Sequence, residues 1–293
     1  MSPALEVVST GALVLVEDEG RPGHAAVGVG RSGAADRGAY RLGARIVGHG
    51  EGRAALEVLL GGLAVRALGR ATVVVTGAPA PTSLDGRPVA HATLVDVPPG
   101  SILALGMPAT GLRSYLTVRG GIDVDPVLGS RSTDSLSLVG PAPPRSGDVL
   151  PVGAPGGGFP TVDHVALPPP GHEGISLLEV LPGPRAAWVG GWGGGLGGLV
   201  GAVWTVTGDS DRVGLRLGGA RVERAEAWAD VELPSEGLVR GAVQVPPGGE
   251  PVVFLADHPV TGGYPVVAVL TASAADRAAQ LRPGDAVRLV PVT

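Results

Sequence analysis

Short apolar runs separated by glycine- and proline-rich turns recur along most of the chain, and this pattern predicts β-strands. The runs lie at residues 12–16, 54–60, 63–68, 71–76, 92–97, 101–105, 113–118 and 146–150 in the first half, and at 242–245, 252–256 and 266–271 in the second. Short strands at this spacing are typical of a barrel or a sandwich. We therefore expect a mainly β protein with a few short helices.

The best helix candidate covers about residues 34–47, directly after Ser32 and Gly33. Its apolar residues fall on one stripe of a helix, at positions 35, 39, 42 and 46. Either Ser32 or Asp36 fits the side-chain acceptor that a helix N-terminus requires.

A segment rich in proline and glycine interrupts the strand pattern at residues 141–174. We place a linker at 154–174, between an N-terminal β-barrel-like half at 1–153 and a C-terminal half at 175–293. The run Leu-Glu-Val-Leu occurs at 56–59 and again at 178–181. Two related barrel-like halves would explain this echo, although chance is a serious alternative in a chain so rich in Gly, Leu and Val.

The composition limits what this protein can be. Aromatic residues make up only 3% of the chain, so the core must be built from Val, Leu and Ala. No apolar run approaches the ~18–20 residues of a membrane span, and the start has no basic segment that would suggest a signal peptide. The absence of cysteine favours a cytoplasmic protein without disulfides, and the net charge of −5 gives no broad basic face for nucleic acid.

All 22 basic residues are arginine, because the chain has no lysine. Biotin is carried on a lysine, so we expect no covalent biotin here. A phosphate-binding loop of the Walker type and Schiff-base catalysis also require lysine. Any anionic substrate must therefore be bound by arginine, backbone N–H groups or a metal.

Two glycine-rich segments and the histidines bear on known chemistry. Gly28-x-Gly30-x-x-Gly33 lacks the preceding strand of a dinucleotide-binding fingerprint, so we do not expect dinucleotide binding. The N–H groups after Ser32 lie at a predicted helix N-terminus, where they could equally bind an anion or only cap the helix. We interpret residues 190–199 as a mobile loop or plain linker. The six histidines show no metal-ligand spacing, so we expect no zinc site.

Ordered motifs along nearly the whole chain resemble the carboxyltransferase A/B family, which includes allophanate hydrolase subunit 2, KipA-like proteins and the C-type subunit of 5-oxoprolinase. The motifs are Glu-Asp-Glu-Gly-Arg at 17–21, Gly-Val-Gly-Arg-Ser-Gly-Ala-Ala-Asp at 28–36, Ala-Leu-Glu at 55–57, Arg-Ser-Tyr-Leu at 113–116, Gly-Ser-Arg-Ser-Thr at 129–133, Ser-Asp-Arg-Val-Gly-Leu-Arg-Leu at 210–217 and Thr-Gly-Gly-Tyr-Pro at 261–265. His258, Pro259 and Val260 depart from the family's usual residues before the last motif. The resemblance implies two cyclophilin-like β-barrel regions.

The resemblance also implies a reaction, in which a 5-oxoprolinase uses ATP, with Mg²⁺, to open 5-oxo-L-proline to L-glutamate. It implies a KipI-like partner subunit and, for 5-oxoprolinase, a LamB/YcsF-type subunit as well. Two alternatives stay open: the carboxyltransferase part of a urea amidolyase or allophanate hydrolase-like system, and a KipA-type regulatory protein that binds a KipI-like kinase inhibitor.

The candidate site residues are polar groups or glycines beside turns in the matching motifs. For catalysis they are Asp36, Asp211, Gln244, Asp257 and Tyr264; for substrate binding they are Arg21, Ser32, Gly33, Arg113, Arg131, Ser132, Arg212, Thr261, Gly262 and Gly263. Glu57 is a further candidate for a base or an Mg²⁺ contact. We expect the front and back motifs to share one cleft, and replacement of Arg21 or Asp257 by alanine to abolish activity with little effect on stability.

Overall fold

The computed structural model describes residues 4–50, 52–158, 161–166, 174–191, 196 and 198–292. Contacts divide the chain into two compact units. The first unit comprises Met1–Arg21, Ser32–Asp134 and Leu138–Gly171, and the second comprises Pro22–Arg31, Ser135–Ser137 and His172–Thr293. The main division, after residue 171, falls within the predicted linker 154–174, of which residues 159–160 and 167–173 lie outside the described part.

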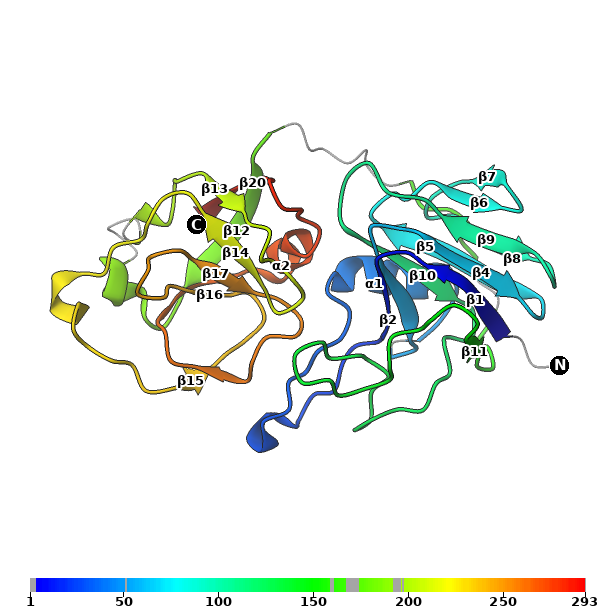
Figure 1. Ribbon diagram of the computed structural model, residues 1–293, viewed down its shortest axis with the longest axis horizontal. Helices are drawn as coiled ribbons and strands as arrows, with labels where there is room; N and C mark the ends of the chain where they lie inside the picture. The colour runs from blue at the N-terminus through cyan, green and yellow to red at the C-terminus, as the bar shows by residue number, and fades with distance from the viewer. Residues whose placement is uncertain are drawn as a thin grey trace. The chain divides into compact units, whose positions relative to one another are not determined.

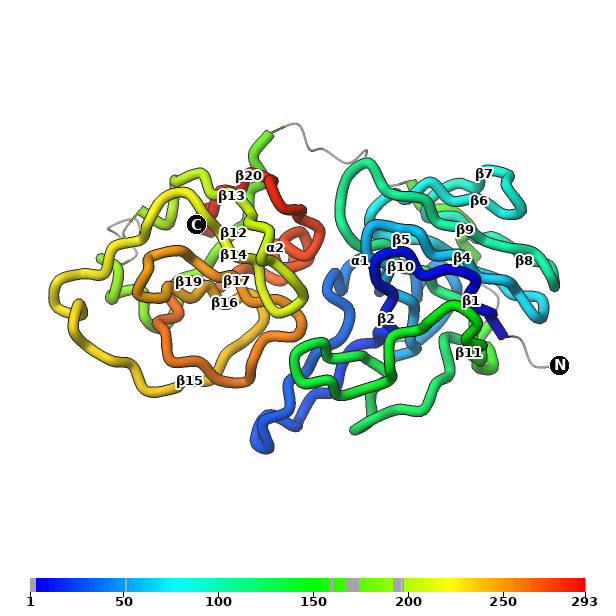
Figure 2. The backbone as a smooth tube through the Cα atoms, in the orientation of Figure 1, coloured from blue at the N-terminus to red at the C-terminus, as the bar shows by residue number. Residues whose placement is uncertain are grey.

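Two antiparallel sheets form the first unit (Figures 1 and 2). The six-stranded sheet has the order β11 (Val149–Pro151), β1 (Ala4–Thr10), β4 (Leu63–Ala67), β9 (Ile102–Leu105), β6 (Thr82–Leu84), β7 (Arg87–Val89). The five-stranded sheet has the order β2 (Leu13–Glu17), β3 (Ala55–Leu59), β10 (Arg113–Val118), β5 (Ala71–Gly77), β8 (Val95–Val97). One apolar cluster draws on both sheets, with Leu5 and Val65 from the first and Leu56 and Leu116 from the second. The sheets therefore share a core.

Helix α1 (Arg37–Ile46) packs against β5 and β10 of the five-stranded sheet. All residues of β10 are buried, because this central strand has the core on one face and polar and helical neighbours on the other. Asp36, rather than Ser32, caps the helix: its Oδ1 accepts from the Ala39 N–H at 2.9 Å. The buried helical face includes Tyr40, Gly43 and Ile46, whereas the predicted stripe positions 39 and 42 are only half-buried.

The second unit contains a closed barrel (Figure 1). Its strands are β12 (Ser176–Pro182), β19 (Val266–Leu270), β16 (Ala242–Gln244), β17 (Val252–Phe254), β14 (Gly214–Gly218), β13 (Trp204–Val206) and β20 (Ala286–Pro291), in ring order. The parallel pair β12–β20 closes the ring. A two-stranded sheet, β15 (Glu236–Gly237) with β18 (Thr261–Gly262), helix α2 (Ala272–Ala278) and the 3₁₀ turns η1 (Ala25–Val27), η2 (Ala186–Val189) and η4 (Glu226–Trp228) complete the unit.

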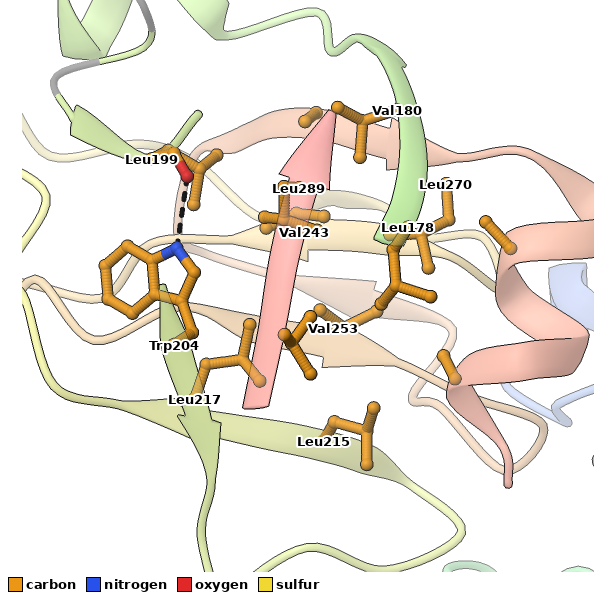
Figure 3. Packing of buried hydrophobic residues seen from close by; sticks show 14 of the residues in the cluster. Leu178, Val180, Leu199, Trp204, Leu215, Leu217, Val243, Val253, Leu270 and Leu289 are labelled. Atoms are coloured by element: carbon orange, nitrogen blue, oxygen red, sulfur yellow. Dashed lines mark hydrogen bonds between the residues drawn. The ribbon is translucent and has the colours of Figure 1, made fainter. Parts of the chain in front are cut away.

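Leucine, valine and one tryptophan fill this barrel (Figure 3). The Trp204 Nε1–H donates to the Leu199 carbonyl at 3.1 Å, which satisfies the one polar atom of a fully buried ring. Leu196 and Leu199 are also fully buried in this core. The segment predicted as a mobile loop at 190–199 is therefore anchored at these two leucines, while residues 192–195 and 197 lie outside the described part.

The prediction of a mainly β protein with barrel regions and few helices is confirmed. The ring is closed only in the second unit; in the first, the strands form two sheets over one core. Helix α2 was missed because its seven residues are mostly alanine and carry no wide apolar stripe. Among the described residues, no helix has the length and apolarity needed to span a membrane.

Candidate functional site

The acidic turn after β2 and the loop at 129–133 form one buried network in the first unit. Both Asp18 carboxylate oxygens accept hydrogen bonds: Oδ1 from Ser130 Oγ at 2.6 Å and from Ser132 Oγ at 2.7 Å, and Oδ2 from the Arg131 N–H at 2.6 Å. The Gly20 N–H also donates to Oδ1, at 2.8 Å. Asp18 therefore holds together two loops that lie more than 110 positions apart in sequence. The sequence analysis did not single it out, although it did single out its neighbour Arg21.

Arg21 lies beside this network and is only 1% exposed. Its Nη2 donates to the Ser132 carbonyl, and a side-chain Cβ at Gly140 would lie 3.0 Å from the same nitrogen. Its Nε and Nη1 have no hydrogen-bond partner among the described residues. Burying a guanidinium costs free energy unless each of its N–H donors has a hydrogen-bond acceptor. Each of these two N–H groups could donate to an oxygen of a carboxylate or a phosphoryl group, and such charge-assisted hydrogen bonds are strong.

The loop Ser32–Asp36 is fixed against the acidic turn. Ser32 and Gly33 both have left-handed backbones, with φ of 54° and 98°. A Cβ at Gly33 would lie 2.9 Å from the backbone of Glu19 and Gly20, so only glycine fits. The Ser32 hydroxyl donates to the Thr133 carbonyl at 3.3 Å. A buried serine held at positive φ is an unusual conformation that such surroundings must stabilise.

A second polar cluster joins this loop to β3 and β10. Glu57 Oε2 accepts from the Tyr115 hydroxyl at 2.8 Å and from the Ala35 N–H at 2.9 Å, while its Oε1 lies 3.3 Å from Arg113 Nε. The Asp36 N–H donates to the same tyrosine oxygen, at 2.8 Å. Burial and the nearby Glu57 raise the pKa of Tyr115 well above its usual value, so the hydroxyl stays protonated. Glu57 thus serves to position the loop, since both its oxygens face partners in the protein.

Arg131 is engaged within the first unit. Its Nε donates to the Val124 carbonyl and its Nη2 to Asp123 Oδ1, both at 2.7 Å. The predicted substrate-binding role of this side chain stays a prediction. The contacts seen here fix the loop that carries Ser130 and Ser132.

In the second unit, Asp257 and Arg212 form a buried ion pair. They are 1% and 4% exposed, and Arg212 Nε lies 2.8 Å from Asp257 Oδ2. The same oxygen accepts from the Ser135 N–H at 2.9 Å and from the Ser135 hydroxyl at 2.6 Å. Sequence analysis missed Ser135. Its only signal was its place two residues after a motif of the first half.

The polar residue inside β16 supports the turn after β18. Gln244 Nε2 donates to the Tyr264 carbonyl at 2.8 Å, and a Cβ at Gly262 would lie only 2.8 Å from that nitrogen. Thr261 and Gly262 pair with β15, and Gly263 follows them in the turn. The Tyr264 side chain is 46% exposed. The glutamine therefore orients this turn and leaves the tyrosine ring accessible.

Asp211 lies apart from these clusters as an exposed turn residue. Its Oδ1 accepts from the N–H groups of Val213 at 2.8 Å and Gly214 at 3.1 Å, which caps the turn before β14. In the described part of the chain, no group of three or more His, Asp or Glu side chains is placed to hold a metal ion.

His49 gives the first unit an acid-sensitive contact. The Gly120 N–H donates to His49 Nε2 at 2.6 Å, so the ring must be neutral. Burial, with Arg53 and Arg119 nearby, lowers the pKa of His49 from 6.5 to about 4. The unfolded chain then binds more protons than the folded one between these values, so stability falls as the pH drops from about 6.5 towards 4.

We therefore expect the thermal midpoint of the first unit to fall between pH 7 and pH 5, and His49→Gln to flatten this dependence. The glutamine oxygen can still accept from Gly120 but does not titrate. Thermal unfolding followed by circular dichroism at several pH values measures this dependence in the wild type and in His49→Gln. The control is His24→Gln, because His24 is half-exposed. Identical pH dependence in the wild type and His49→Gln would contradict this role.

The structure thus places Arg21 and Ser132 in the network around Asp18, and Asp36 and Arg113 in the cluster around Glu57. The hydroxyl of Ser32, on the loop between them, is bonded to Thr133. In the second unit it joins Arg212 to Asp257, and Gln244 to the 261–265 turn. The shared cleft of the front and back motifs stays a prediction.

The sequence of the chain matches one family. Residues 27–291 match the model of the carboxyltransferase domain, subdomains A and B, so the chain belongs to this family.

Individual relatives add detail. The chain is 34% identical to the C-type subunit of 5-oxoprolinase from Escherichia coli over 98% of its own length and 90% of that protein. It is 31% identical to the urea amidolyase of Lachancea kluyveri, covering 99% of this chain but only 17% of that protein. It is also similar to the crystal structure of Kluyveromyces lactis urea carboxylase, with a TM-score of 0.89 and 29% identity over 100% of this chain and 28% of that one.

Proposed function

We propose that this chain is the C-type subunit of an ATP-dependent 5-oxoprolinase, which opens 5-oxo-L-proline to L-glutamate. The observation that carries the proposal is an end-to-end likeness to two proteins named as this 5-oxoprolinase subunit, in E. coli and in Haemophilus influenzae. In the second, 29% identity covers 99% of this chain and 91% of that protein. The urea amidolyases match this chain with only a small part of their length.

The chemistry explains why such an enzyme needs anion-binding groups. A lactam carbonyl is a poor electrophile, so transfer of a phosphoryl group from ATP to its oxygen makes the carbon attackable. Water then adds to that carbon and the C–N bond breaks, which frees the amine and leaves an acyl phosphate. A second water hydrolyses this acyl phosphate to the glutamate side-chain carboxylate and free phosphate. Both the phosphoryl charge and the 5-oxoproline carboxylate need donors in a water-poor site.

Arg21 is our proposed anion donor, because its Nε and Nη1 are buried and lack partners among the described residues. N–H groups and hydroxyls of the neighbouring loops would complete the cradle. ATP suits such a donor set. Since the described residues offer no cluster of three metal ligands, we propose that Mg²⁺ is held mainly by the nucleotide phosphates, as is common for this ion.

The test is reconstitution of the purified chain with its proposed partner subunits. ADP release that depends on 5-oxoproline, with one glutamate formed per ADP, would support the proposal. Carboxylation of urea on addition of a biotin carboxylase and a carrier would instead support the second candidate, which the urea amidolyase and urea carboxylase relatives favour. Neither activity in a verified complex would contradict both.

We further propose that the chain acts only in complex with a KipI-like subunit and a LamB/YcsF-type subunit. The word "subunit" in the names of both relatives supports a multi-chain enzyme. Co-expression with the KipI-like protein is expected to give one peak of summed mass in size-exclusion chromatography with light scattering. Two separate peaks at micromolar concentration would contradict the pairing.

A further inference from the structure

A pocket in the second unit lies outside all the residues discussed so far. Its volume is about 410 Å³, and it is lined by residues 221–224, Ala229 and the turn 247–249. This volume falls in the range of small-molecule sites, roughly 300–1,000 Å³.

The two walls of the pocket are fixed to each other. The Val222 N–H donates to the Gly249 carbonyl at 2.9 Å, and the Val222 side chain is buried in the barrel core. Gly249 has φ of 80°, and a Cβ there would lie 2.9 Å from the Val222 carbonyl oxygen. Gly248 differs, because its backbone is not left-handed and an added Cβ would meet nothing within 4 Å. The space beside Gly248 is therefore open to a ligand.

Arg224 is positioned in the pocket by aromatic rings. Its guanidinium carbon lies 5.4 Å from the Trp188 ring centroid, and Trp188 stacks on Trp228 at 4.8 Å between centroids. Its one hydrogen bond within the described part of the chain is a long contact of 3.4 Å, from Nη1 to the Val231 carbonyl. The buried Nε has no partner there. A guanidinium has five N–H donors, so most of those on Arg224 are unused.

Arg221 supplies the second charge. It is exposed and makes no hydrogen bond or ion pair with the described residues. The lining also contains Glu223, whose negative charge offsets only one of the two positive charges of Arg221 and Arg224. Two arginine forks in a preformed pocket match the geometry of a carboxylate or phosphate. We propose that this pocket binds a small oxyanion, a carboxylate or phosphate compound, independently of the function proposed above.

The experiment is calorimetric titration of the full chain with inorganic phosphate and, separately, with succinate, in a buffer containing neither. We expect saturable binding of at least one of them, with a dissociation constant of about 1 mM or below. Binding of phosphate alone would identify a phosphate-ester site, and binding of succinate alone a carboxylate site. Arg221→Gln and Arg224→Gln should each weaken binding at least about tenfold, the loss expected for a charge-assisted pair.

Arg216→Gln on β14 is the matched control, since Arg216 is also exposed on this unit but does not line the pocket. Arg224 packs on Trp188, so its replacement could disturb folding. Arg221 is exposed, so a loss of binding in Arg221→Gln reports on the pocket and not on folding. No saturable binding of either anion, or unchanged binding by Arg221→Gln, would overturn the proposal.

Discussion

Replacing Asp257 with alanine is expected to destabilise the second unit by about 3–5 kcal/mol, the usual cost of removing one partner of a buried ion pair. The change removes the carboxylate that pairs with Arg212 and accepts both hydrogen bonds from Ser135. From the sequence we expected this variant to keep its stability. The 1% exposure of Asp257 leads to the opposite expectation.

Urea unfolding followed by tryptophan fluorescence measures this effect directly. All four tryptophans, at positions 188, 192, 204 and 228, follow residue 172, where the long segment of the second unit begins. The exposed Asp209→Ala is the control and should change the free energy of unfolding by no more than about 0.5 kcal/mol. The double variant Arg212→Met with Asp257→Leu should recover much of the loss, since an apolar pair needs no desolvation of charge. Equal midpoints for Asp257→Ala and Asp209→Ala would show that the pair contributes nothing.

Replacing Arg21 with glutamine is expected to lower kcat/KM for 5-oxoproline-dependent ATP hydrolysis by about 100-fold or more in the reconstituted complex. Hydrogen bonds to a charged group contribute about 1.5–3 kcal/mol each, and the loss of two exceeds the roughly 2.7 kcal/mol that 100-fold represents. Glutamine is uncharged and shorter, so it cannot supply two charge-assisted N–H donors.

Arg87→Gln on β7 is the matched control for this experiment, because Arg87 is an exposed arginine of the same unit. Unlike Asp257, Arg21 is a buried charge with two donors that lack partners among the described residues, so its replacement should cost little stability. Circular dichroism should show the Arg21→Gln midpoint within a few degrees of the wild type, and the variant should still co-purify with its partners. An activity within twofold of the wild type in an intact complex would remove Arg21 from the site. Complete activity loss together with unfolding would instead assign Arg21 a structural role.

The strand pattern could be predicted from the sequence because most of these strands are short apolar runs bounded by turns. Their side chains are either buried throughout or alternately buried and exposed. Strand β10 occupies Arg113–Val118, as the run at 113–118 predicted. Strand β4 begins where the run 63–68 predicted and ends one residue earlier, at residue 67. Strand β6 was not predicted, because it is only three residues long and carries two polar side chains. Pairing with neighbours forms such strands, and pairing depends on residues far away in the chain.

Among the site residues, the sequence identified the polar groups that are out of place in a β-rich core. Arg21, Glu57, Arg212, Gln244 and Asp257 are all buried, whereas the sequence predicted only that they are site candidates. It did not identify Asp18 or Ser135, whose importance comes from the loops they join across more than 110 positions.

By itself, therefore, the sequence determined the fold class through the spacing of its apolar runs, and the family through the resemblance of its ordered motifs. Its composition set the chemical limits that follow from arginine as the only strong base. Only the tertiary structure decided which polar groups are satisfied by the protein and which are not. Glu57 and Asp257 have their carboxylates engaged by neighbours, whereas Arg21 retains two buried donors without partners among the described residues. The reason is physical: a buried charge is defined by its three-dimensional neighbours, and these come from loops that the linear sequence keeps far apart.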